Sequence, residues 1–185
     1  MTTSTGSLAT DFASVVAQLR ENAAALTSMT AAGAWSQLPT AAMPDLTADL
    51  FRVRDLLASA ANEGVGAVHA SGALPGGHVS TTRWLEIATG MSASSAGAQL
   101  ARSRSLREGF ARTRMAWLAG RISDDMVRTI TTGIPAALKR LGVADVPALV
   151  ADIERTLVPY AMESSVAAVG LALLARALRA DRSTA

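Results

Sequence analysis

Apolar residues recur at spacings of three and four along almost the whole 185-residue chain. This is the period of an α-helix that packs one face against a core. Alanine, the residue with the highest helix propensity, occurs 39 times. No segment alternates apolar and polar side chains as a half-buried strand would. The sequence therefore predicts an all-α fold, and its first helical face consists of Leu8, Phe12, Val15, Leu19, Ala23 and Leu26.

Turn and capping residues divide this pattern into about seven to nine short helices of a compact bundle. The stretch from Gly33 to Pro44 is expected to be a loop. Asp45 should then cap the second helix. Gly64 and Gly66 should weaken the last turns of that helix by about 1 kcal/mol each relative to alanine.

Two prolines are expected to interrupt helices in the second half of the chain. Pro135 lies inside a run that Ser123 should cap, and it should kink or divide that helix. The next helix should close near Pro159, and its acidic residues Asp152 and Glu154 are expected to face solvent.

Two of the expected helices form a hairpin that resembles a helix-turn-helix. Ser80 or Thr81 should open the first helix, Gly90 should end it, and Ser92 should open the second. In a helix-turn-helix, the second helix enters the major groove of DNA. The sequence therefore predicts such a hairpin near residues 81–105.

Several classes of chemistry are excluded by what the sequence lacks. With no cysteine there can be no disulfide, cysteine-ligated zinc, iron–sulfur cluster or cysteine nucleophile. His69 and His78 are nine residues apart across a Gly- and Pro-rich stretch, unlike the i, i+4 pair of a helical zinc site. No phosphate-binding loop or nucleophile elbow occurs. We expect no enzyme activity, no catalytic residue, no metal site and no cofactor.

The ends of the chain give no targeting signal. Residues 1–8 lack the basic and apolar regions of a secretory signal. The most apolar run, Val166–Leu178, is shorter than the ~20 residues of a membrane span and contains Arg176. We interpret it as a buried terminal helix, and we expect a cytoplasmic protein without membrane association.

One segment, Arg83 to Arg121, carries a charge imbalance. It holds seven arginines and two glutamates, a net charge of +5, so the rest of the chain sums to −3. A basic face of this kind is typical of nucleic-acid contact, and neighbouring side chains such as Gln99 and Ser103 could donate hydrogen bonds to phosphates. The alternative is a solvated face with intramolecular ion pairs. The candidate phosphate-binding residues are Arg83, Arg102, Arg104, Arg107, Arg112 and Arg114.

The same region resembles a known family. The run from His78 to Leu85, the turn from Thr89 to Ser92 and the segment from Ala96 to Leu106 are similar to the core of the domain-of-unknown-function 222 family. The segment from Trp117 to Arg128 is similar to the family's next motif. The resemblance covers about residues 45–181.

A single helical domain is expected over residues 1–185. It would comprise an N-terminal helix and loop at 1–44, the family-like region, and a frayed tail at 182–185.

The resemblance implies a DNA-associated lineage, while the residues of this chain supply no nuclease. The family is typically the N-terminal part of actinobacterial proteins with a C-terminal HNH nuclease module. This chain ends at Ala185, before any such module, and Met126 stands where the family often has histidine.

The leading hypothesis is therefore a non-catalytic DNA-associated module. The alternative is a protein-interaction or self-associating helical module with no nucleic-acid binding. In that alternative the terminal helix Val166–Leu178 is the candidate interaction face, and Leu173→Glu should dissociate the dimer.

Overall fold

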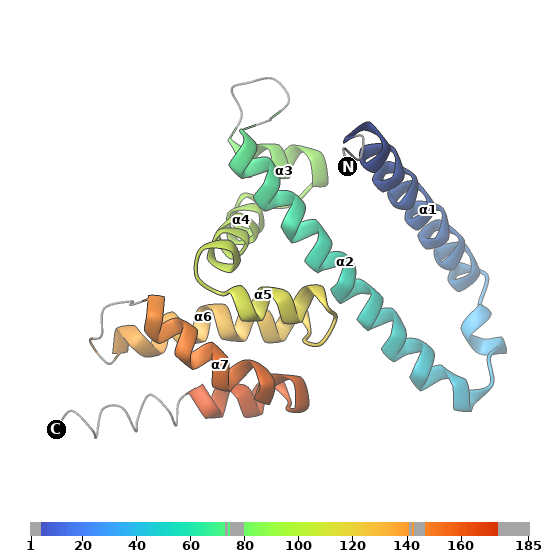
Figure 1. Ribbon diagram of the computed structural model, residues 1–185. Coiled ribbons are helices and arrows are strands. Elements are labelled where there is room, and N and C mark those ends of the chain that lie inside the picture. The colour runs from blue at the N-terminus through green and yellow to red at the C-terminus, as the bar shows by residue number, and fades with distance from the viewer. Residues whose placement is uncertain (1–4, 73, 75–79, 141, 143–146, 174–185) are drawn as a thin grey trace. The chain divides into compact units, whose positions relative to one another are not determined.

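The computed structural model describes residues 5–72, 74, 80–140, 142 and 147–173, and every regular element in these ranges is helical. The prediction of an all-α fold is confirmed. Residues 166–173 form a further helical stretch. The named elements, drawn in Figure 1, are α1 (Thr5–Ala31), the 3-10 turns η1 (Ala34–Gln37) and η2 (Thr40–Ala42), α2 (Met43–Ser71), α3 (Thr81–Thr89), α4 (Ala93–Glu108), α5 (Ala111–Leu118), α6 (Asp124–Arg140) and α7 (Pro147–Glu163).

The chain forms two compact units, residues 1–49 and residues 50–185. The first unit contains α1, both 3-10 turns and the start of α2. The second contains the rest of α2 and all later helices. A single domain over residues 1–185 stays a prediction.

The expected hairpin is present, and its ends are set by local capping. The hydroxyl of Ser80 accepts a hydrogen bond from the backbone N–H of Arg83 and starts α3. Gly90 ends α3 with a left-handed φ of 73°, a conformation that glycine adopts without strain. Ser92 caps α4 by accepting from the N–H of Ser95. The hairpin is confirmed, while its entry into a DNA groove stays a prediction.

The second helix starts earlier than expected. α2 begins at Met43, so Pro44 and Asp45 both lie in its first turn and Asp45 is not the cap. Proline is tolerated there because the first N–H groups of a helix have no partner inside it. The helices are also not uniformly short, because α1 has 27 residues and α2 has 29.

The two internal prolines do not end their helices. Pro135 lies inside α6, which is continuous, and Pro159 lies inside α7, which extends to Glu163. The end of this helix, expected near Pro159, lies at Glu163. Buried residues flank each proline, among them Ile134 and Val158. We attribute the continuity of both helices to this packing, which offsets the ~3 kcal/mol that an internal proline costs.

Two apolar clusters hold the second unit together. The larger joins the end of α4 with α5, α6, α7 and residues 166–173, and Trp117 is its largest buried side chain. The smaller joins α2, α3 and α4 through Val65, Leu85 and Ala96, with Trp84 packed against it.

The larger cluster buries one side of the expected interaction face on the terminal helix, while Val166 and Leu171 are exposed. Val169 and Leu173 are buried in it, so they cannot form an exposed docking surface. Residues 174–178 of that prediction lie outside the described residues. A substitution at Leu173 would disturb the core rather than test self-association.

Candidate nucleic-acid interface

The six candidate arginines differ in where their side chains point. Arg114 is one of two that are held inside the second unit. Its Nε and Nη2 donate to the two carboxylate oxygens of Glu63 at 2.6 and 2.5 Å, which ties α5 to α2. This bidentate hydrogen bonding lowers the pKa of Glu63 and raises that of Arg114. Arg114 is therefore engaged in a contact between helices.

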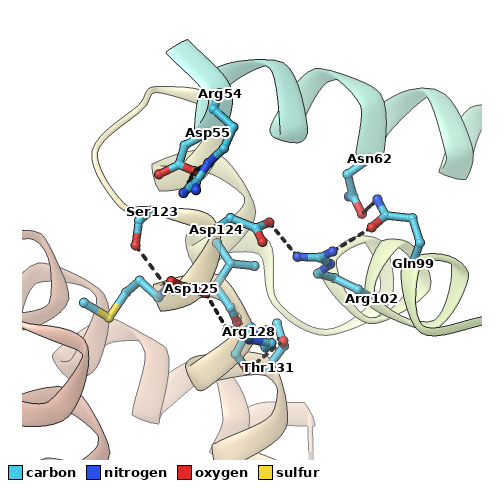
Figure 2. Close-up of polar contacts among 12 residues, drawn as sticks. Arg54, Asp55, Asn62, Gln99, Arg102, Ser123, Asp124, Asp125, Arg128 and Thr131 are labelled. Carbon is cyan, nitrogen blue, oxygen red and sulfur yellow. Dashed lines mark hydrogen bonds and ion pairs between the residues drawn. The ribbon is translucent and has the colours of Figure 1, made fainter. Parts of the chain in front are cut away.

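Arg102 is the second inward-pointing arginine, and Figure 2 shows it between two acceptors. Its Nη1 donates to Oδ1 of Asp124 on α6 at 2.5 Å, and its Nη2 donates to Oε1 of Gln99 at 2.6 Å. Its guanidinium carbon lies 5.6 Å from the ring centroid of Trp117, within the range of a cation–π contact. These contacts link α4, α5 and α6.

The polar contacts continue from Arg102 to α2. Nε2 of Gln99 donates to Oδ1 of Asn62 at 3.3 Å (Figure 2). The hydroxyl of Ser103 donates to the backbone oxygen of Asn62 at 3.0 Å. Asn62 and Ser103 are fully buried. Gln99 and Ser103, expected as phosphate donors, are therefore used inside the protein. Among the described residues, Nδ2 of Asn62 and Nε1 of Trp117 are buried without a hydrogen-bond partner.

Arg107 is exposed but lies close to α2. A Cβ placed on Gly66 would be 2.7 Å from Cδ of Arg107 and 2.8 Å from its Nη1. Arg107 also contributes to the lowered pKa of Glu63 through its charge. Both Cδ and Nη1 of Arg107 thus lie against Gly66, while the residue as a whole remains exposed to solvent.

Arg83, Arg104 and Arg112 are the most available of the six. Arg83 pairs with Glu86 at 2.7 Å and Arg104 with Glu108 at 3.6 Å, and both arginine side chains are more than half exposed. Exposed pairs of this kind contribute about 0–1 kcal/mol, so a phosphate can replace the glutamate at little cost.

Arg112 and Arg121 lie at the edge of a groove. Neither arginine has an ion-pair partner in the part of the chain that the structure describes. The groove has a volume of about 530 Å³ and runs between α5 and α7. Its walls are mainly apolar and include Met115, Val158 and Met162.

The charge of the chain is divided between the two units. Residues 50–185 carry 16 basic and 11 acidic side chains, a net charge of +5, whereas residues 1–49 carry one arginine and four aspartates or glutamates, a net charge of −3. The positive potential that would attract a polyanion therefore belongs to the second unit.

The expected positions of the acidic residues hold for Asp124, Asp125 and the half-exposed Asp152, and are wrong for Glu154. Ser123 caps α6 by accepting from the N–H of Met126, and Asp124 and Asp125 occupy its first turn as expected. Glu154, in contrast, is only 2% exposed and lies inside the protein. Its carboxylate accepts hydrogen bonds from Thr113 on α5, 41 residues away in the chain. No pattern in the local sequence predicts this contact.

The histidines give no metal centre in the described ranges. Nδ1 of His69 lies 3.0 Å from the hydroxyl of Thr81, and His78 lies outside the described residues. No group of three or more potential metal-ligating side chains occurs in the part of the chain that was searched. None of the helices in that part is both long and apolar enough to cross a membrane.

No protein-family model, curated protein or solved structure matches this chain. The resemblance to the domain-of-unknown-function 222 family therefore stays a prediction.

Proposed function

We propose that the second unit is a non-catalytic, DNA-associated helical module that contacts phosphates through the arginines of α3, α4 and α5. The observation that carries this proposal is the set of exposed arginine residues, Arg83, Arg104, Arg107 and Arg112, on a unit of net charge +5. Arg102 and Arg114 support the surface indirectly, because their contacts hold α4 and α5 in place. By the resemblance, the module is related to the N-terminal domain of HNH endonuclease-like proteins.

Salt dependence is the first property to measure. Each phosphate that an arginine neutralises releases a counterion, so four contacts should weaken binding about a hundredfold between 50 and 200 mM salt. Fluorescence anisotropy with a labelled random-sequence duplex gives this slope. The absence of binding at low salt would contradict the proposal.

A matched pair of variants separates these arginines from net charge alone. Arg104→Glu with Arg112→Glu should abolish binding and leave the helical signal in circular dichroism unchanged. The control is Arg128→Glu with Arg155→Glu, since both arginines are exposed surface residues outside the segment and the change in charge is the same. An equal loss of binding in the two double variants would contradict the proposal that these arginines contact DNA.

A further inference from the structure

The groove between α5 and α7 has apolar walls that belong to the second unit alone. Ala116 and Val158, which line it, are buried in the larger cluster, whereas Met115 and Met162, which also line it, are 61% and 40% exposed. Methionine is flexible and polarizable, and it is frequent on surfaces that adapt to a bound partner. Exposed apolar side chains gathered around a groove are typical of a binding site.

Two arginines bring positive charge to opposite ends of α5. Arg112 lies in the first turn of α5 and Arg121 lies three residues beyond its end, and both are exposed and line the groove. Neither has an ion-pair partner in the part of the chain that the structure describes. α5 has 8 residues and is therefore about 12 Å long. An occupant that pairs with both cations must be elongated and carry negative charge near both ends.

These features favour a helix of a partner protein over other occupants. A groove of this kind binds an amphipathic helix that lays its apolar face against the walls. Protein interfaces are enriched in methionine and arginine and depleted in acidic residues, as this lining is. A phosphate backbone would leave the apolar walls in contact with water, and a small ligand with one charged group would pair with only one of the two arginines.

We propose that the groove between α5 and α7 binds an amphipathic helix of a partner protein that carries acidic residues at both ends of its apolar face. The apolar side chains of that helix pack against Met115, Val158 and Met162, and its carboxylates pair with Arg112 and Arg121. This site goes beyond the proposed contact with DNA and shares only Arg112 with it.

The test selects peptides from a display library against the full chain in the absence of DNA. The library holds random peptides of about 16 residues, which as helices extend past both ends of α5. Counter-selection uses Met115→Glu with Met162→Glu, which places negative charge in the apolar wall at two exposed positions. We expect enriched peptides with apolar residues at helical spacing between acidic ends. No enrichment, or enriched peptides without acidic ends, would overturn the proposal.

Fluorescence anisotropy with one enriched peptide then tests the two arginines. Arg112→Gln with Arg121→Gln should weaken binding about tenfold, because two exposed ion pairs are lost. Arg83→Gln with Arg104→Gln is the control, since it removes the same charge at exposed positions that do not line the groove. An equal loss in both double variants would overturn the proposal. A control variant that loses DNA binding but keeps peptide binding separates this proposal from the proposed function.

The remaining occupants are tested with the same methionine variant. Dodecanoate and a random-sequence DNA duplex stand for a small amphiphilic anion and for DNA, and light scattering detects a second copy of the chain. If Met115→Glu with Met162→Glu abolished binding of either probe, or dissociated a dimer, while no helical peptide was enriched, the groove would belong to that occupant and the proposal would be overturned.

Discussion

The carboxylate of Glu154 on α7 accepts two hydrogen bonds from Thr113 on α5. One comes from the backbone N–H at 2.8 Å and the other from the hydroxyl at 2.6 Å. Thr113 is the third residue of α5, and Phe110, at the N-cap, gives no side-chain cap. Glu154 therefore satisfies a free N–H of α5 from a distant helix, and its negative charge lies at the positive end of the helix dipole.

Glu154→Ala should be among the most destabilising single substitutions in the second unit. It removes the acceptor of two buried donors and leaves a cavity, which together should cost about 3 kcal/mol in the free energy of unfolding. Urea denaturation followed by circular dichroism measures this loss. The neighbouring Arg155→Ala is the control, since Arg155 is exposed, and a similar loss there would contradict the assignment.

The pair of Glu63 and Arg114 should make stability depend on pH in the acid range. The hydrogen bonds from Arg114 lower the pKa of Glu63 below its ordinary value of 4.5. The ion pair therefore contributes its full stability above that value and loses it as the pH falls through the lower pKa of the folded state. Both side chains are partly exposed, so the contribution should be about 1 kcal/mol.

Urea midpoints at pH 7 and at pH 3 test this prediction. Glu63→Gln should lower stability at pH 7 and reduce the difference between the two conditions. Glu108→Gln serves as the control, because its pair with Arg104 is long and exposed. If Glu63→Gln left the acid dependence unchanged, the loss of stability would have another origin.

Replacing each of two glycines of α2 by alanine should change the stability of the protein in opposite directions. A Cβ at Gly66 would lie 2.6 Å from the hydroxyl of the buried Ser103, so Gly66→Ala should destabilise by about 1–3 kcal/mol. A Cβ at Gly64 meets nothing within 4 Å, so Gly64→Ala should stabilise by up to about 1 kcal/mol. Thermal unfolding of the two variants gives the comparison. A gain in stability for both would show that α2 does not require its close approach to α4.

These glycines also separate what could be predicted from what could not. The expectation that each weakens α2 follows from propensity alone and treats the two positions as equal. At Gly66 the packing of α4 against α2 decides the outcome instead, since Ser103 and Arg107 occupy the space of a side chain. Only the tertiary arrangement distinguishes the two positions.

The sequence by itself determined the helical class and several helix ends, because both depend on residues close together in the chain. The hydroxyls of Ser80, Ser92 and Ser123 each accept a hydrogen bond from a backbone N–H three residues away. Their role as helix caps can therefore be predicted from the neighbouring residues in the chain.

Arg102, Arg114 and Glu154 form hydrogen bonds with residues that lie 22, 51 and 41 positions away in the chain. Whether a charged side chain meets solvent or a buried partner is set by which helices pack together. For that reason only the tertiary structure could divide the arginine segment into exposed residues and residues that hold the fold.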